Sequence, residues 1–222
     1  QSVVIKETTL LDTVKTVSRL SSEHPVRKYM QMRKIPEERW DELRLVNKFY
    51  TFVNRLIPNK FPRVEEDHPR LIIPFYDKTG KLTGFQGRAF GSEKPKNITI
   101  MLDETAPKLY GLDKVNLTEK IYVVEGPIDS MFIDNSIAMA GADATKLPSN
   151  GDYVFVYDNE PRNPEIVKRM QKHIDNNDTV VIWPDNVGEK DINDMIIAGK
   201  SKLEILDIIS KRTHKNLSAK MR

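Results

Sequence analysis

The segment IYVVEGPIDS, residues 121–130, joins a short apolar run to a glycine, a proline and the start of a helical pattern. Three further apolar runs follow along the chain, at residues 137–140, 153–157 and 179–183. Helical patterns lie between or after these runs, at about 127–135, 164–175 and 191–198. Strands that alternate with helices are typical of a parallel sheet with right-handed crossovers. We therefore predict a parallel α/β domain over residues 116–199.

The chain on either side of this domain has different patterns. Residues 1–57 are polar, with apolar positions at irregular helical spacing, and they are predicted to be helical. A β-hairpin is predicted from runs 71–76 and 82–90 around a turn at 77–80, with a third strand at 97–102. Residues 201–211 predict a last helix before a basic tail. The fold class is therefore α/β, α+β overall, in three parts: 1–115, 116–199 and 200–222.

Composition excludes several classes of protein. The chain has 222 residues, of which 39% are hydrophobic and 30% charged, and it has no cysteine. Disulfide frameworks and cysteine zinc sites are excluded, and the four histidines lack paired zinc-ligand spacing. No apolar run approaches the roughly 20 residues of a membrane span, and no secretory signal is evident. We expect a cytoplasmic protein without zinc or a membrane partner; its start at Gln1 is typical of a fragment or a processed product.

Charge is distributed in blocks. Residues 1–115 contain 21 Lys/Arg and 15 Asp/Glu, a net of +6, whereas residues 116–199 contain 7 and 15, a net of −8. Residues 200–222 contain 7 and 2, a net of +5. Chance surface composition is one explanation. The alternative is a carboxylate site for divalent cations beside a surface that binds polyanions.

Acidic side chains follow three of the predicted parallel strands. Ligands of open parallel sheets bind beyond the carboxyl ends of the strands, so these ends predict a site. The acidic positions there are Glu125 and Asp129 after the first strand, Asp158 and Glu160 after the third, and Asp185, Asp191 and Asp194 after the fourth. Clustered carboxylates repel one another unless a cation neutralises them. Oxygen ligands alone favour Mg²⁺ or Mn²⁺ over zinc.

Each acidic cluster also has a purely structural explanation. Aspartate is common in turns after strands, and Asp191 is a plausible helix cap. Gly126 allows a sharp turn at the strand end, and Pro127 suits the first turn of a helix. Three such clusters at one sheet edge favour the functional interpretation.

Three segments resemble the signatures of a Toprim domain, the metal-binding module of bacterial-type primases, type IA and II topoisomerases and some nucleases. They are YVVEGPIDSMFI (122–133), VYDNEPRNP (156–164) and KDINDMI (190–196). In that family a glutamate follows the first strand and an Asp-x-Asp follows a later one. This chain departs from the pattern, because Glu160 stands where the second aspartate is expected.

Upstream segments resemble the bacterial-type primases in particular, and among them the T-even type of bacteriophage DNA primase. They are EHPVRKYMQMRKIP (23–36), RLIIPFYDKTGKLTGFQGRAF (70–90) and PKNITIMLDETAPKLYGLD (95–113), the last with Lys96 and Lys108 twelve residues apart. The resemblance covers essentially the whole chain. In that family a zinc-binding domain precedes the polymerase core, so the resemblance implies the catalytic core alone or one segment of a longer primase.

The resemblance implies metal-dependent synthesis of RNA primers from nucleoside triphosphates on single-stranded DNA, with a replicative helicase as partner and phage-infected cytoplasm as location. Asp158 and Glu160 are then the main ligands of Mg²⁺ or Mn²⁺, and Glu125 is a ligand or the general base. Asp191 and Asp194 serve a second metal or support the first, and Gly126 and Asp129 support the site. Triphosphate, template or product would be bound by basic residues: Arg70, Arg88, Lys96, Lys108 and Arg162.

Two other functions stay open from the sequence. A Toprim nuclease would use the same carboxylates to activate water and would not need Lys96 and Lys108. A non-catalytic scaffold would bind single-stranded DNA with a degenerate site. A topoisomerase is disfavoured, because the chain is too short for the gate and the tyrosine domain of that class.

Overall fold

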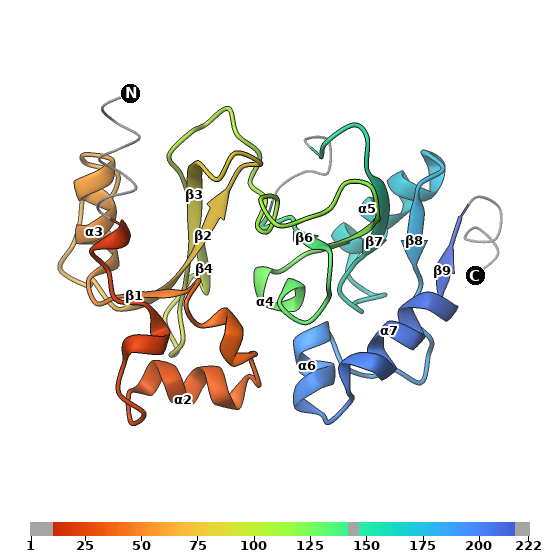
Figure 1. The fold of residues 1–222 in the computed structure, drawn as a ribbon, viewed down its shortest axis with the longest axis horizontal. Helices are drawn as coiled ribbons and strands as arrows, with labels where there is room; N and C mark the ends of the chain where they lie inside the picture. The colour runs from red at the N-terminus through yellow and green to blue at the C-terminus, as the bar shows by residue number, and fades with distance from the viewer. Residues whose placement is uncertain (1–10, 142–146, 216–222) are drawn as a thin grey trace. The chain divides into compact units, whose positions relative to one another are not determined.

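A computed structural model describes residues 11–141 and 147–215. The chain divides into two compact units, Gln1–Asp113 and Lys114–Arg222 (Figure 1). None of the helices in the described segments has the length and apolar character that a bilayer crossing requires. Residues 216–222 of the predicted basic tail lie outside the described residues.

The first unit is built on an antiparallel sheet in the order β1-β2-β3-β4. The predicted hairpin is present as β2 (Arg70–Tyr76) and β3 (Leu82–Arg88), and the third strand is β4 (Asn97–Met101). The Asp77 carboxylate accepts hydrogen bonds from the backbone N–H groups of Thr79 and Lys81 and so closes the hairpin turn.

The first unit also contains helical segments. They are the 3₁₀ turns η1 (Val17–Arg19) and η2 (Glu37–Arg39) and the helices α2 (Pro25–Met32) and α3 (Phe49–Leu56). Phe49 of α3 is fully buried and packs in one cluster with Ile72 and Phe85 of the sheet. A Cβ atom at Gly87 would lie 2.3 Å from the Phe49 ring, so this close approach requires glycine.

The prediction of helix throughout residues 1–57 is wrong at β1 (Arg44–Val46). This three-residue strand pairs antiparallel with β2, from Arg44 opposite Ile72 to Val46 opposite Arg70. The strand exists because a partner edge lies beside it, and so short a segment shows no alternation of its own.

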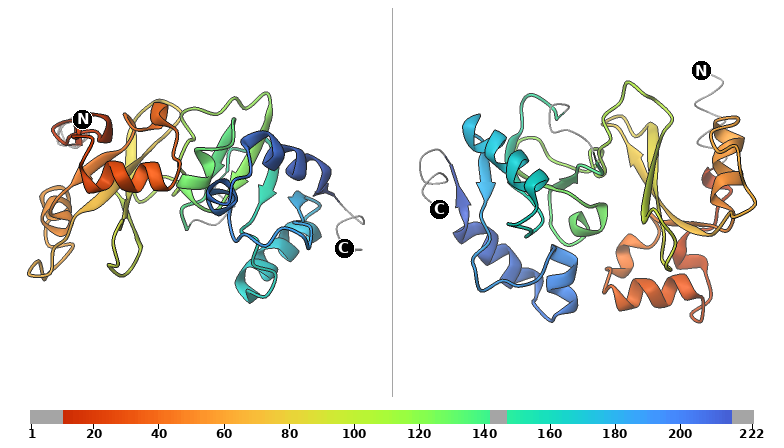
Figure 2. Two further views of the ribbon diagram at one scale, coloured as in Figure 1. Left: turned by 90° about the horizontal axis from the view of Figure 1, so that it is seen from below. Right: turned by 180° about the vertical axis from the view of Figure 1, so that it is seen from behind.

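The second unit contains a five-stranded sheet in the order β6-β5-β7-β8-β9. The parallel strands are β5 (Lys120–Val124), β6 (Ser136–Ala138), β7 (Asp152–Val156) and β8 (Thr179–Val181). The helices are α4 (Pro127–Ser130), α5 (Pro164–Asp175), α6 (Ile192–Ile197) and α7 (Lys202–Lys211). Helix α5 covers one face of the sheet, and α6 and α7 lie on the other face (Figure 2). The predicted mixed α/β fold class is confirmed.

Two details of this unit differ from the sequence predictions. Helix α4 is a single turn rather than a helix to residue 135, because Phe132 and Ile133 make only turn hydrogen bonds to Asp129 and Ser130. An unpredicted strand, β9 (Thr213–His214), pairs antiparallel with β8. Two residues carry no strand signal, and the edge of β8 determines their conformation.

Candidate functional site

Two of the predicted acidic residues meet at the carboxyl end of the parallel sheet. Glu125 directly follows β5, and Asp158 lies just beyond β7, the neighbouring strand. The Glu125 Oε2 atom accepts a hydrogen bond from the Asp158 backbone N–H at 3.2 Å. The parallel order of β5 and β7 therefore brings residues 33 positions apart into contact.

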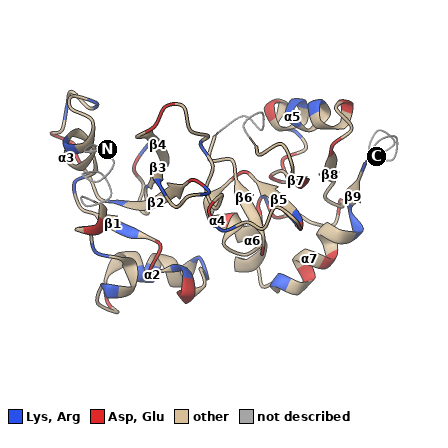
Figure 3. Cartoon of the chain, turned by 45° about the horizontal axis from the view of Figure 1, so that its top comes forward, with Lys and Arg blue, Asp and Glu red and all other residues tan. Residues whose placement is uncertain are grey.

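Electrostatic repulsion is strong at Asp158. Burial, together with the negative charges of Glu125, Asp129 and Asp191, raises the pKa of its carboxyl to about 8, while the positive charge of Lys190 opposes this rise. Carboxylates that follow all three strands therefore act on Asp158, and a perturbed carboxyl of this kind is typical of functional sites. Figure 3 shows the aspartates and glutamates of the described residues in red.

Asp129 and Asp191 fix the helix that carries the third acidic motif. Asp129 is buried in α4, and its Oδ1 atom accepts a hydrogen bond from the backbone N–H of Asn193 at 2.9 Å. Asp191 caps α6 by accepting from the backbone N–H of Asp194 at 2.7 Å. Asp191 is thus a helix cap as well as a member of the acidic cluster, and Asp194 lies in the first turn that it caps.

Gly126 supports this arrangement for a reason other than the sharp turn that the sequence suggested. Its φ angle is −106°, which any residue adopts. A Cβ atom there would lie 2.6 Å from Asp129 Oδ2, so a larger residue would have to displace this buried carboxylate. Pro127 occupies the first turn of α4, as predicted.

We expect Gly126→Ala to reduce the free energy of unfolding by about 1–2 kcal/mol, because Asp129 must move away from Asn193 to admit the methyl group. Urea denaturation measures the change. Gly188→Ala is the matched control, since a Cβ at Gly188 would meet no atom within 4 Å. Equal stability of the two variants would contradict the proposed role of Gly126.

Two cationic side chains hold carboxylates of the cluster. Arg169 of α5 forms an ion pair with Glu125, with 3.1 Å between Nη1 and Oε1. The Lys190 ammonium lies 3.2 Å from Glu160 Oε2 and 3.9 Å from Asp158 Oδ2. A cavity of about 850 Å³ adjoins these groups and is lined in part by Asp158, Glu160 and Arg162.

The donor chemistry of the cluster fits Mg²⁺ or Mn²⁺. Partly buried carboxylates repel one another there, and hard divalent cations prefer such oxygen donors. Within residues 11–141 and 147–215, however, no three acidic or histidine side chains converge around one point that would hold an ion.

The predicted basic residues of the first unit lie in different environments. Lys96, just before β4, and Lys108 are exposed. Arg88 is partly buried and donates from Nε to the Tyr29 hydroxyl at 2.8 Å.

Arg70 is fully buried and presents no free surface in this conformation. It donates four hydrogen bonds, to His68 Nε2 and to the carbonyl oxygens of Gly87, Pro95 and Lys96, at 2.7–3.1 Å. Its guanidinium also lies 5.5 Å from the Phe49 ring centroid. The structure therefore gives Arg70 a supporting position beneath Lys96, where direct contact with a ligand is not available.

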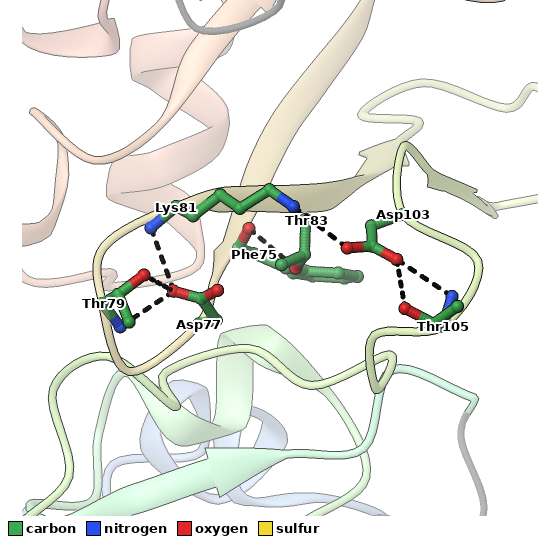
Figure 4. A network of polar contacts seen from close by, with 7 residues as sticks. All are labelled: Phe75, Asp77, Thr79, Lys81, Thr83, Asp103 and Thr105. Carbon is green, nitrogen blue, oxygen red and sulfur yellow. Dashed lines mark hydrogen bonds and ion pairs between the residues drawn. The ribbon is translucent and has the colours of Figure 1, made fainter. Parts of the chain in front are cut away.

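A polar network holds the segment that leads to Lys108 (Figure 4). Lys81, beside the hairpin turn, donates to Asp103 Oδ2 at 3.1 Å, and Asp103 Oδ1 accepts from the Thr105 backbone N–H and hydroxyl. These hydrogen bonds lower the pKa of Asp103 to about 2. The segment after β4 is thereby tied to β3.

Comparison with known proteins shows what the chain as a whole is similar to. No family model matches the chain. The chain is 38% identical over 211 residues to the DNA primase of Enterobacteria phage T4, and the match covers 93% of this chain and 61% of that primase. The chain is a relative of the phage T4 DNA primase. It spans about 61% of that protein's length.

Solved structures show that this primase relative has the fold of primase catalytic cores. The zinc-binding and RNA polymerase domains of Aquifex aeolicus primase match with a TM-score of 0.71 at 18% identity, over 98% of this chain and 62% of that one. A DnaG primase catalytic domain bound to single-stranded DNA matches with a TM-score of 0.68 at 16% identity, over 95% and 81% of the two chains.

Three polar side chains at the site of this primase relative were missed by sequence reasoning. Arg169 and Lys190 pair with the acidic cluster, and Asn159 joins the loops after β7 and β8. Lys190 and Asn159 lie inside the acidic motifs, so their position in the sequence was a usable signal. Arg169 carried none, because exposed arginines are common on helices.

Proposed function

We propose that this chain is the catalytic core of a DNA primase. It joins nucleoside triphosphates into short RNA primers on a single-stranded DNA template, in concert with a replicative helicase in the cytoplasm of the infected cell. The observation that carries the proposal is the contact of Glu125 with Asp158 at one end of the parallel sheet, with Asp191 near enough for its charge to act on Asp158, in a chain related to the T4 primase.

The reaction is a nucleotidyl transfer. The 3′-hydroxyl oxygen of one nucleotide bonds to the α-phosphorus of the next, the bond from that phosphorus to the bridging oxygen breaks, and pyrophosphate leaves. A bound Mg²⁺ or Mn²⁺ would neutralise the charge that develops on the phosphate oxygens. The chain's own part is positioning and electrostatic stabilisation.

The residues divide this work as follows. Asp158 and Glu160 would hold the metal, and Asp191 and Asp194 would hold a second ion or orient these two carboxylates. Glu125 would either bind the metal or accept the proton of the attacking hydroxyl as the general base. Exposed Lys96 and Lys108 bind the triphosphate through charge-assisted hydrogen bonds. Arg88 and Arg162 contact nucleic acid.

The proposal is tested by incubation with single-stranded DNA, labelled nucleoside triphosphates and Mg²⁺. We expect short RNA products, and we expect Lys96→Ala and Lys108→Ala to lower their yield by about 10–100-fold, because each removes a charged contact to phosphate. Lys78→Ala in the exposed hairpin turn is the control and should leave the yield unchanged.

Other outcomes identify the competing functions. A nuclease would degrade the DNA, and its activity would be insensitive to Lys96→Ala and Lys108→Ala. A scaffold would bind the DNA without products, and Glu125→Gln would leave that binding unchanged. Either result would contradict the primase proposal.

A further inference from the structure

Asn159 joins the loop after β7 to the loop after β8, in addition to the Trp183 indole N–H, which donates to the Tyr157 carbonyl oxygen. The Asn159 backbone N–H donates to the carbonyl oxygen of Lys190 at 2.6 Å. Its side-chain amide donates to the carbonyl oxygens of Val187 and Glu189 at 2.7 and 3.1 Å. Asn159 stands between Asp158 and Glu160 in the sequence. These three hydrogen bonds therefore hold the Lys190 backbone beside the two acidic residues.

The Lys190 side chain reaches back over the same two acidic residues. Its ammonium lies 3.2 Å from Glu160 Oε2 and 3.9 Å from Asp158 Oδ2. Glu160, the residue that departs from the Asp-x-Asp pattern, is the carboxylate that Lys190 approaches most closely. The Lys190 side chain is 52% exposed, whereas those of Asp158 and Glu160 are 21% and 32% exposed. The lysine can thus move into solvent, but the carboxylates are confined.

A divalent cation bound by Asp158 and Glu160 would bring positive charge to the place that the Lys190 ammonium occupies. Like charges a few ångströms apart at a partly hydrated site repel strongly enough to alter binding by about tenfold. The two cations therefore cannot both bind these carboxylates at full strength.

We propose that Lys190 is a built-in counter-cation that competes with the divalent metal for Asp158 and Glu160 and thereby weakens metal binding by the nucleotide-free protein. The inference rests on the proposed function, which assigns these carboxylates to the metal. Lys190 stabilises the acidic pair in the metal-free state and must release it when the metal binds. Asn159 keeps the lysine within reach, so this competition is present in every molecule.

The test is titration of the full 222-residue chain with Mn²⁺, without nucleotide or DNA, with free Mn²⁺ followed by electron paramagnetic resonance. Sites that disappear in Asp158→Asn define the acidic pair. We expect Lys190→Met to bind Mn²⁺ at these sites about tenfold more tightly, equivalent to about 1.4 kcal/mol. Lys190→Gln, which is smaller and polar, should show the same gain.

Two controls separate this competition from a general effect of charge or fold. Lys190→Arg keeps the positive charge and should stay within about twofold of the wild-type affinity. Lys168→Met removes a charge from the exposed surface of α5 and should leave the affinity unchanged. Unchanged or weaker Mn²⁺ binding by both Lys190→Met and Lys190→Gln would overturn the inference, as would an equal gain in Lys168→Met.

These outcomes are distinct from failure of the proposed function. Mn²⁺ binding that depends on Asp158 but is insensitive to Lys190 overturns the counter-cation and leaves the primase proposal intact. Tighter binding by Lys190→Met, in a protein that makes no RNA, supports the counter-cation and contradicts the primase proposal. Absence of any Mn²⁺ site that depends on Asp158, in the wild type and in Lys190→Met alike, overturns the inference.

Discussion

Asp158→Asn is expected to lower primer synthesis by about a thousandfold, because it removes an anionic oxygen from the centre of the acidic cluster without changing the size of the side chain. RNA yield on single-stranded DNA with Mg²⁺ measures the loss. Asp134→Asn is the matched control, since Asp134 lies in the same unit but pairs with Lys202, and its side chain is 79% exposed. Synthesis within about tenfold of wild type would remove Asp158 from the catalytic machinery.

The same substitution is expected to stabilise the metal-free fold. The pKa of Asp158 is raised from 3.8 to about 8 in the folded state, so the folded protein binds the proton more tightly than the unfolded chain. Stability of the metal-free wild type therefore falls as pH rises from about 4 to about 8. The neutral asparagine does not take part in this loss.

Thermal unfolding at pH 8.5 with a chelator distinguishes this effect from simple damage. We expect Asp158→Asn to unfold at least about 2–4 °C above the wild type, which corresponds to about 1 kcal/mol or more. The difference should diminish as the pH falls toward 4 and below, because the wild-type carboxyl is protonated in both states only below its unfolded pKa of 3.8. Mg²⁺ should raise the unfolding temperature of the wild type and have little effect on the variant. A variant less stable than the wild type at pH 8.5 would contradict electrostatic repulsion at Asp158.

Capping residues and apolar periodicity predicted the helices and strands whose formation depends little on distant parts of the chain. Helix α5 has the predicted bounds, because Asn163 caps it, Pro164 begins it and buried Ile166 and Ile174 lie at helical spacing. Strands β1 and β9 were missed, because each is only two or three residues long and forms against a partner strand. Periodicity cannot report a partner that is distant in the sequence.

The acidic site was predictable for a related reason. In a parallel sheet, topology alone carries the strand ends to one edge, so Glu125, Asp158 and Asp191 were found from strand order. Hydrogen bonds and ion pairs between separate loops follow no such rule. The contacts of Lys190 and Arg169 depend on the directions of single side chains, which patterns of strands and helices in the sequence do not predict.

Arg70 shows the same limit for a basic residue. An arginine just before a predicted hairpin looks like an exposed phosphate ligand. In the structure, Phe49 covers one side of its guanidinium, and the carbonyl oxygens of Pro95 and Lys96 accept its hydrogen bonds. A buried cation with carbonyl partners is costly to replace, because each acceptor is left without its hydrogen bond.

Arg70→Met is therefore expected to reduce the free energy of unfolding by about 3 kcal/mol or more, since three buried or partly buried carbonyl oxygens lose their donor. Urea denaturation measures the change. Arg88→Met, which removes a hydrogen bond to Tyr29 from a partly exposed arginine, should cost about 1 kcal/mol. Lys96→Met should leave stability unchanged, because only the carbonyl group of Lys96 contacts Arg70.

Comparison of these variants separates support of the fold from binding of phosphate. If Arg70 acts by positioning Lys96, Arg70→Met should weaken triphosphate use only to the extent that the segment around residues 95–96 becomes disordered. The Arg70→Met variant, kept folded at low temperature, should then retain part of its activity. Lys96→Met should lose triphosphate use at full stability. A stable Arg70→Met variant with lost nucleic-acid binding would instead make Arg70 a direct ligand, which requires that its four hydrogen bonds open when substrate binds.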